Sequence, residues 1–202
     1  FFILAATLGA FTAFLTGTQA MVSLELKKVL AYSTMSQIGY MMLALGVAGL
    51  NMNALTCAFS AGIFHLISHG AFKAALFLCA GALIHVSGSI YISEMKLSRR
   101  VMGLTWLFMW LASLSLMGVP PLSGFWSKDD ILISCLQSGQ YVLFVIAFVT
   151  VAITCFYTMR FMGIIFHEEE ENVESEAAEK KLGPLMFVPY GILAVLTLAL
   201  GL

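Results

Sequence analysis

The chain has 202 residues, of which 60% are hydrophobic and 10% charged, with a net charge of −1 and a mean hydropathy of +0.96. A soluble domain carries about 25% charged residues, so this chain has too few charges to cover the surface of one. The composition excludes a disordered chain, a secreted disulfide scaffold and a nucleic-acid binder. It favours an integral membrane protein.

The cysteines do not form a recognisable site. Four of them lie far apart in apolar runs without a C-x-x-C pair: Cys57, Cys79, Cys135 and Cys155. This spacing is typical of buried packing residues. Nucleotide-binding glycine motifs are absent as well, so the sequence predicts no metal site and no cofactor site in this chain. Because both ends lie within apolar runs, we expect an internal piece of a longer protein.

Six apolar stretches are long enough to cross a bilayer, which takes about 20 helical residues. They are Phe1–Met21, Val29–Gly49, Ala54–Val86, Val101–Leu132, Tyr141–Phe166 and Pro184–Leu202. In lipid the backbone has to pair its polar groups within the chain, and the alternation of a membrane barrel is absent. The prediction is an all-α, polytopic transmembrane bundle of about six helices.

Basic residues occur in every second loop between these stretches. The first, third and fifth loops contain or border Lys27, Lys28, Lys96, Arg99, Arg100, Arg160, Lys180 and Lys181, and the two loops between them carry no charge. The positive-inside rule therefore predicts that the basic loops are cytoplasmic. The fifth loop also holds an acidic run from Glu168 to Glu179, which we interpret as a solvated linker rather than a docking site.

Lys73 lies near the middle of the third stretch, where a charge costs about 3 kcal/mol on insertion scales. His65, His69 and Lys73 follow an i, i+4, i+8 spacing and stack along one helix face. One membrane histidine is often a packing residue, but two histidines and a lysine in a column can hold and pass protons near neutral pH. Since no cysteine or carboxylate joins them, a zinc site is disfavoured.

The fourth stretch contains G-V-P-P-L-S-G-F-W-S-K-D-D. Pro120 and Pro121 cannot continue a regular helix, and broken membrane helices line cavities in transporters. A simple packing kink is the alternative. Lys128 follows the break and precedes Asp129 and Asp130. A lysine near a helix end can also reach the interface, but the break and the adjacent acids favour an ion path leaving the membrane.

The second stretch has a polar side formed by Ser33, Gln37 and Tyr40, with Ser36 adjacent. Two compatible interpretations are open. These residues can form hydrogen bonds between helices, as is common in membranes. They can also form a hydrated wall beside the column of histidines and lysine.

Three segments carry a resemblance to a known family. They are, in chain order, E-L-K-K-V-L-A-Y-S-T-M-S-Q-I-G-Y-M, H-L-I-S-H-G-A-F-K-A-A-L-F-L and G-V-P-P-L-S-G-F-W-S-K-D-D-I-L. Together they resemble the antiporter-like membrane subunits of respiratory complex I, of the NADH-quinone oxidoreductase subunit L type. Similar subunits serve archaeal deazaflavin-dependent dehydrogenases and multi-subunit sodium/proton antiporters. The resemblance is strong from Val22 to Ile133 and extends only to hydropathy elsewhere.

The resemblance implies a fold of two inverted five-helix repeats, each with one broken helix and each forming a half-channel. Residues 1–166 correspond to the second repeat. Residues 167–183 would be an acidic cytoplasmic loop, and residues 184–202 would start a further transmembrane helix. The first repeat and the long lateral helix of the family are not recognised in this piece.

The resemblance also implies roles for single residues. Lys73 corresponds to the central proton-carrying lysine, and His65 and His69 correspond to the histidines that relay protons to it. Lys128 corresponds to the lysine after the break, near the exit, and Asp129 to the acid beside it. Glu25 stands where many relatives have Asp and is expected to be a charge partner with a longer arm. Channel-lining roles are expected for Ser33, Ser36, Gln37, Tyr40, Pro120 and Pro121.

The expected function is that of a proton-translocating subunit of a complex I-like NADH or reduced-deazaflavin:quinone oxidoreductase in a prokaryotic cytoplasmic membrane. Protons would load through His65 and His69 onto Lys73 and leave past Lys128. Flavin, iron–sulfur clusters and quinone would belong to partner subunits. The alternatives are a subunit of a multi-subunit sodium/proton antiporter or membrane-bound hydrogenase, and a structural anchor, which would need no intramembrane lysines.

Overall fold

The chain folds into helices throughout the part that the structure describes. The computed structural model describes residues 1–95, 102–166 and 186–202, except for the side chains of residues 52–54, and contains no β-sheet there. Its elements are α1 (Phe2–Val22), α2 (Leu26–Ala48), α3 (Met52–Ser87), the 3-10 helix η1 (Ile92–Glu94), α4 (Gly103–Met117), α5 (Ser123–Gln137), α6 (Tyr141–Ile165) and α8 (Phe187–Ala199). The expected all-α bundle is confirmed. Lys96, Arg99, Arg100 and the acidic loop lie outside the described residues.

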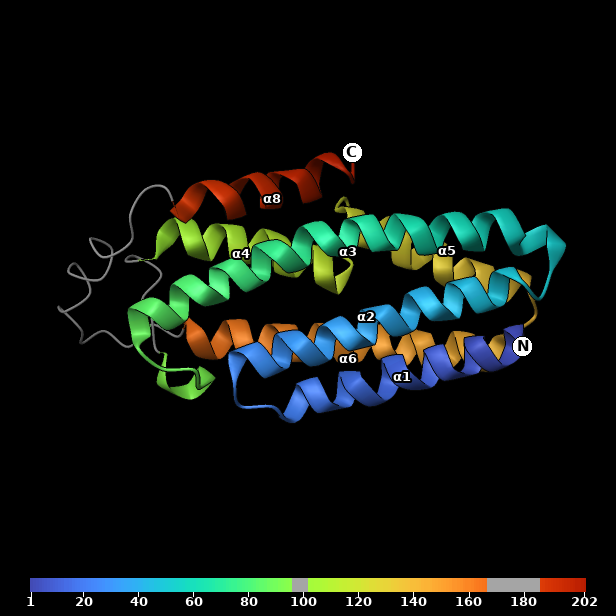
Figure 1. Ribbon diagram of the computed structural model, residues 1–202, viewed down its shortest axis with the longest axis horizontal. Helices are drawn as coiled ribbons and strands as arrows, with labels where there is room; N and C mark the ends of the chain where they lie inside the picture. The colour runs from blue at the N-terminus through green and yellow to red at the C-terminus, as the bar shows by residue number, and fades with distance from the viewer. Residues whose placement is uncertain (96–101, 167–185) are drawn as a thin grey trace.

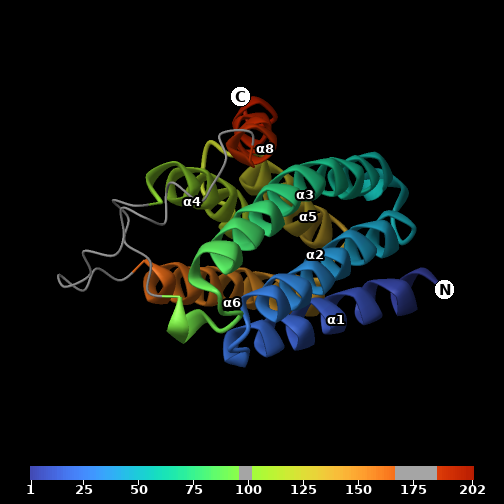
Figure 2. The same cartoon turned by 60° about the vertical axis from the view of Figure 1, so that its left-hand side comes forward.

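The helices run side by side along the long axis of the molecule (Figure 1). In Figures 1 and 2, α1, α2 and α6 lie together on one side, and α3 lies with α4 and α5 on the other. Helix α8 is outermost and packs on α3 and α4. The long α3 contacts α2, α4, α5 and α8, so a polar residue on its inner face lies at the centre of the bundle.

The described loops lie at two ends of the bundle. Leu26 N donates to Ile90 O at 3.1 Å, and Ile92 N donates to Leu24 O at 2.9 Å, which joins the α1–α2 loop to the η1 segment. Arg160, near the end of α6, donates to Ser23 O at 3.0 Å. We call this the basic end. At the opposite end the α2–α3 turn meets the α5–α6 turn.

Three of the described helices are long and apolar enough to cross a membrane by themselves: α1, residues 55–87 of α3, and α6. This is fewer than the six stretches expected, for physical reasons. The break divides the fourth stretch into α4 and α5, with 15 residues each, and α8 has 13. Helix α2 has 23 residues but also carries polar residues, among them Ser33, Ser36 and Gln37.

The break between α4 and α5 follows from local backbone chemistry. Helix α4 ends at Met117 and is followed by Gly118, whose φ of +83° is a left-handed conformation that glycine adopts easily. The N–H groups of Gly118 and Val119 cap α4 by donating to Leu114 O at 3.1 and 3.0 Å. Pro120 and Pro121 follow, with a cis peptide bond between them, and α5 starts at Ser123.

The end of α8 rests on this break. A Cβ atom added to Gly201 would lie 2.3 Å from Pro121 O and 2.6 Å from Ser123 N, so no other residue fits there without movement. The Trp126 indole also donates to Gly201 O at 3.0 Å. The residues just after α8 are therefore held directly against the start of α5.

The buried apolar residues form two clusters, one toward each end. The cluster near the basic end includes Leu26, Phe72 and Ile92, and the other includes Leu43 and Leu143. Buried polar side chains lie on the same inner faces of α2, α3, α5 and α6. Further buried polar side chains lie on α1, α4 and α8.

Candidate functional site

Lys73 lies inside the bundle, with 4% of its surface exposed. Its ammonium group donates to Leu30 O of α2 at 3.1 Å and to the Ser33 hydroxyl. Ser33 in turn donates to Leu30 O at 2.9 Å. Two neutral oxygens from one turn of α2 therefore hold the amine.

His65 is fully buried and connects three helices. Its Nδ1 lies 2.8 Å from Ser127 Oγ of α5, and its Nε2 lies 3.1 Å from Gln37 Oε1 of α2. Because an amide oxygen only accepts, Nε2 carries the hydrogen in this contact, and a neutral ring then accepts at Nδ1 from the Ser127 hydroxyl. The imidazole is thus held in one orientation.

His69 lies between His65 and Lys73 on α3. The two imidazole centroids are 6.3 Å apart, and His69 packs edge-on against Phe72 at 5.4 Å. Three buried polar atoms of this region have no hydrogen-bond partner among the described residues: Gln37 Nε2, Ser68 Oγ and His69 Nε2. Buried polar atoms of this kind are where proteins bind internal water.

Lys128 is held by a carbonyl that the break leaves free. In a continuous helix Leu116 O would accept from the N–H of residue 120, but Pro120 has none. The Lys128 ammonium donates to Leu116 O instead, and it lies 5.8 Å from the centroid of the Tyr40 ring. With 3% of its surface exposed, Lys128 is inside the protein and does not reach the interface.

These groups form a file along the bundle in the order Lys73, His69, His65, Lys128. Ser127, the neighbour of Lys128 in sequence, bonds to His65 and so joins the last two members. The histidines therefore lie between the two lysines. A path that loads Lys73 through both histidines and then passes Lys128, as expected from the sequence, would have to traverse the file twice.

Neither lysine of the file has a carboxylate partner within the described residues. The one ion pair found there joins Lys28 to Glu25 at 2.6 Å, on the surface at the start of α2. Glu25 thus pairs within its own helix turn. No opposite charge lies beside either ammonium group in this apolar bundle. The state in which both lysines are charged at once is therefore unfavourable.

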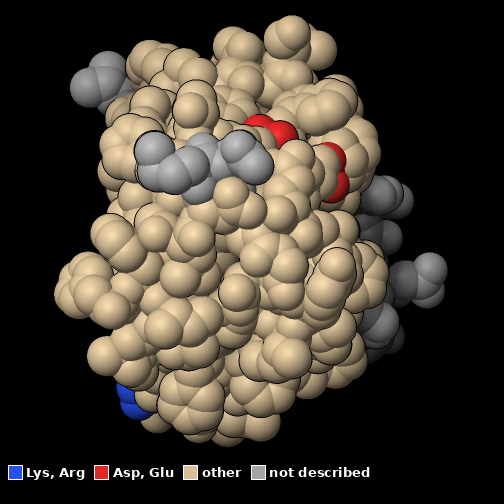
Figure 3. Space-filling model, turned by 90° about the vertical axis from the view of Figure 1, so that its right-hand side faces the viewer, with Lys and Arg blue, Asp and Glu red and all other residues tan. Residues whose placement is uncertain are grey.

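Asp129 does not pair with Lys128, because successive residues of a helix do not face each other. Asp129 is half-buried and Asp130 is exposed. Figure 3 views the end opposite the basic end and shows acidic side chains on a largely uncharged surface. The roles expected for Lys128 and Asp129 at an exit stay predictions.

Three of the residues expected to line the channel lie elsewhere. Ser36 donates to Ala13 O at 2.8 Å and so joins α2 to α1. Pro120 and Pro121 are exposed and act by interrupting the helix. Ser33 and Gln37 contact the file directly. Tyr40 lies beside Lys128, and its hydroxyl donates to Ala147 O at 2.6 Å.

Two contributions to the site were missed in the sequence, although each had a signal. Ser127 precedes Lys128 and points to a different side of α5, toward α3. The free carbonyl of Leu116 follows from the proline four residues later. Among the described residues no group of three or more His, Cys, Asp or Glu side chains could hold a metal ion.

Relatives of this chain are named as a chain or subunit of an NAD(P)H- or NADH-quinone oxidoreductase. It is 40% identical over 194 residues to the NAD(P)H-quinone oxidoreductase chain 5 of Synechocystis sp., covering 92% of this chain and 26% of that protein. It is 38% identical over 175 residues to the NADH-quinone oxidoreductase subunit L of Rickettsia bellii, covering 85% and 26%. The chain thus spans about a quarter of the length of these relatives.

Solved structures share the fold. A chain of the Mrp complex from Dietzia sp. matches all of this chain with a TM-score of 0.86 and 23% identity, over 44% of its own length. A chain of respiratory complex I from Thermus thermophilus matches 99% with a TM-score of 0.85 and 22% identity, over 40% of its own length. Residues 2–154 match the family described as NADH:quinone oxidoreductase/Mrp antiporter, TM. The chain therefore belongs to this family of membrane proteins.

Proposed function

We propose that this chain is part of a proton-translocating membrane subunit of a complex I-like NADH or reduced-deazaflavin:quinone oxidoreductase. The observation that carries the proposal is the buried file of Lys73, His69, His65 and Lys128. The relatives of this chain are named as oxidoreductase subunits. Electron transfer would take place in partner subunits, which would hold the flavin, the iron–sulfur clusters and the quinone.

In the proposed mechanism a proton moves along the file between the two lysines. A lysine that gives up its proton becomes a neutral amine, which an apolar bundle accommodates more easily than an ammonium. The histidines accept and donate through their two ring nitrogens. Water bound at the unpartnered atoms of Gln37, Ser68 and His69 would bridge the two imidazoles, whose centroids are 6.3 Å apart.

The proposal places the protein in a prokaryotic cytoplasmic membrane with the basic end in the cytoplasm. Lys27 and Lys28 support this orientation through the positive-inside rule. Other membrane subunits of the same complex would be its partners.

The first test is the substitution Lys73→Ala in the full-length protein and its complex. Without the amine the file has no donor at this end, so we expect proton pumping into sealed vesicles to fall to background while the complex still assembles. Lys27→Ala is the control, because Lys27 is exposed at the basic end. Wild-type pumping by the Lys73→Ala complex would contradict the proposal.

The second candidate function is that of a sodium/proton antiporter subunit. It is favoured by the structural match to the Mrp complex, at a TM-score of 0.86. Co-purification separates the two candidates. Iron–sulfur or flavin subunits in the purified complex support the oxidoreductase, whereas their absence together with sodium-dependent proton exchange supports the antiporter.

A further inference from the structure

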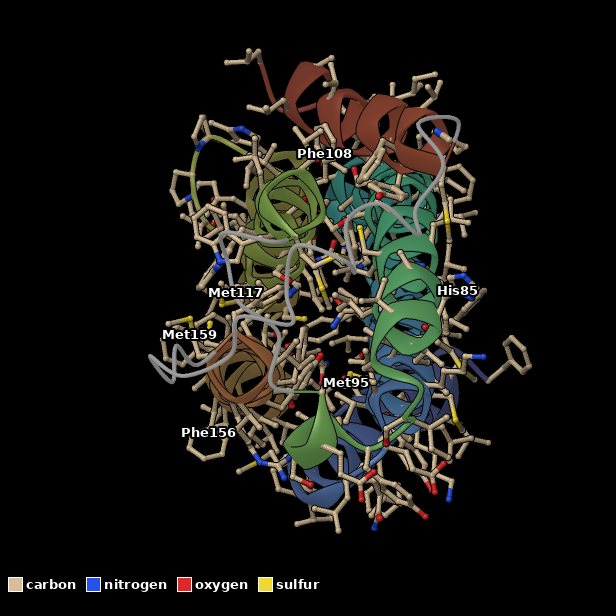
Figure 4. All side chains as sticks on the ribbon, turned by 90° about the vertical axis from the view of Figure 1, so that its left-hand side faces the viewer. His85, Met95, Phe108, Met117, Phe156 and Met159 are labelled. Carbon is tan, nitrogen blue, oxygen red and sulfur yellow. The ribbon has the colours of Figure 1, made fainter. Side chains whose placement is uncertain are left out.

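Helix α6 has a second set of buried hydroxyl groups, which the file described above does not use. Thr150, Thr154, Tyr157 and Thr158 all have no exposed surface. The opposite side of α6 is apolar and points outward, as Figure 4 shows for Phe156 and Met159. These four hydroxyl groups of α6 thus face the inside of the bundle.

The threonine hydroxyls nearer the centre are satisfied within α6. Thr150 donates to Ile146 O at 2.7 Å, and Thr154 donates to Thr150 O at 2.9 Å. The hydroxyls of Tyr157 and Thr158 have no hydrogen bond of good geometry among the described residues. Burying a hydroxyl without a partner is costly, and a phenylalanine would fill the place of Tyr157 without that cost.

Tyr157 faces the site of Lys73. Its hydroxyl interacts electrostatically with the hydroxyls of Thr154 and Ser33. Ser33 is the residue whose hydroxyl accepts from the Lys73 ammonium. One serine oxygen therefore separates the phenol from the amine.

The register of α2 and α6 places Tyr157 level with the turn of α2 that holds Lys73. The two helices are antiparallel and are joined where the Tyr40 hydroxyl bonds to Ala147 O. With a rise of about 1.5 Å per residue, Ser33 lies roughly 10 Å nearer to the basic end than this contact, and Tyr157 roughly 15 Å nearer. Leu30, whose carbonyl accepts from Lys73, also lies roughly 15 Å nearer by the same count. Tyr157 is thus level with the turn of α2 that holds the amine, whereas His65, which bonds to Gln37, lies farther from the basic end.

We propose that the Tyr157 hydroxyl carries protons between Lys73 and the basic end of the bundle, through Ser33. When Lys73 is a neutral amine, the Tyr157 phenol passes its proton to Ser33 Oγ. The Tyr157 oxygen then takes up another proton from the side of the basic end. Ser33 passes its own proton to Lys73 Nζ, which becomes an ammonium. One O–H bond breaks and one forms at each oxygen, and rotation of the hydroxyls restores the start.

This arm is covered by apolar side chains at its outer end. Ile92 and Met95, at the η1 segment, are each 2% exposed and pack in the same cluster as Tyr157 and Phe161. Figure 4 shows Met95 between α6 and the α2–α3 pair. Methionine is flexible and adapts to small changes in shape, so it suits a cover that proton uptake has to displace.

The test rests on the proposed function and uses the full complex in sealed vesicles. Tyr157→Phe removes one oxygen that has no partner of good geometry, so the fold should be retained. We expect pumping to fall at least about tenfold, as for loss of a positioned proton carrier, and the solvent deuterium isotope effect on pumping to rise. Tyr190→Phe is the control, because that buried phenol bonds to Thr105 at 3.1 Å, away from the file.

A second variant keeps the test sharp. Tyr157→His retains a proton-carrying ring and should recover most of the pumping. The proposal is overturned if Tyr157→Phe pumps like Tyr190→Phe, or if its pumping falls with an unchanged isotope effect. If Lys73→Ala is silent while Tyr157→Phe is normal, the arm through Tyr157 is wrong and the proposed function stands. If Lys73→Ala pumps normally, the proposed function itself fails.

Discussion

Single side chains decide how two ammonium groups are kept in an apolar bundle. Lys73 and Lys128 each donate to a backbone carbonyl, and neither has an ion pair within the described residues. A neutral acceptor stabilises an ammonium less than a carboxylate does, so the charged and neutral forms of each amine are closer in free energy than in an ion pair. Groups balanced in this way can exchange a proton.

Ser127 joins α5 to the histidines through its hydrogen bond to His65. Ser127→Ala would leave Nδ1 of the fully buried His65 without its 2.8 Å partner. We expect a loss of about 1–3 kcal/mol in the free energy of unfolding and slower pumping. Thermal unfolding of the purified complex and vesicle assays measure the two effects.

Ser138→Ala is the matched control for Ser127→Ala, because Ser138 also belongs to the α5 region and its hydroxyl has no partner to lose. This control should unfold and pump like the wild type. Equal behaviour of the two alanine variants would show that the contact between Ser127 and His65 has no role.

At the scale of elements, the break between α4 and α5 converts one membrane-length stretch into two short helices and a site. Pro120 and Pro121 remove the N–H groups that Leu116 O and Met117 O would otherwise accept from. The first carbonyl accepts from Lys128, and the second accepts from the Cys155 thiol of α6 at 3.8 Å. Both carbonyls freed by the break are therefore used.

Close contact between the two half-helices depends on Gly124. A Cβ atom there would lie 1.8 Å from Ser115 O, so Gly124→Ala has to push α5 away from α4. We expect a loss of about 1–3 kcal/mol, as for other overpacked sites, and weaker pumping because Lys128 moves with α5. Thermal unfolding and vesicle pumping are the measurements.

The control is Gly163→Ala in α6, where an added Cβ meets nothing within 4 Å. Alanine favours a helix by about 1 kcal/mol over glycine, so this variant should be at least as stable as the wild type. If both alanine variants behave alike, the close packing of Gly124 does not matter for the site.

At the scale of the whole molecule, the loops divide between two chemically different ends. Hydrogen bonds join Ser23 to Arg160 and Leu24 to Ile92 at the basic end. At the other end Asn51 Nδ2 donates to Gln137 O at 3.4 Å. The polar file lies between these ends, inside the bundle.

Labelling of introduced cysteines tests how the two ends face the membrane. The native Cys57, Cys79, Cys135 and Cys155 are first replaced by alanine. In intact cells a membrane-impermeant thiol reagent should then label Gln137→Cys, and it should label Lys27→Cys only after the membrane is opened. The reverse pattern would show that the basic end faces outward.

Much of this arrangement could be predicted from sequence, because its causes are local. The i, i+4, i+8 spacing of His65, His69 and Lys73 fixes a shared helix face, and the two prolines fix the break. What could not be predicted depends on how helices distant in sequence pack. The contact of Ser36 with α1, the exposure of Pro120 and Pro121, and the position of the histidines between the lysines all depend on that packing.

The contact of α8 with the break has a mechanical consequence. Gly201 leaves no space between the end of α8 and Pro121 or Ser123, and Trp126 ties the same point to α5. A side chain at position 201 would therefore have to displace the start of α5, the helix that carries Ser127 and Lys128. The residues just after α8 thus help to position the start of α5, although they contribute no atom to the file.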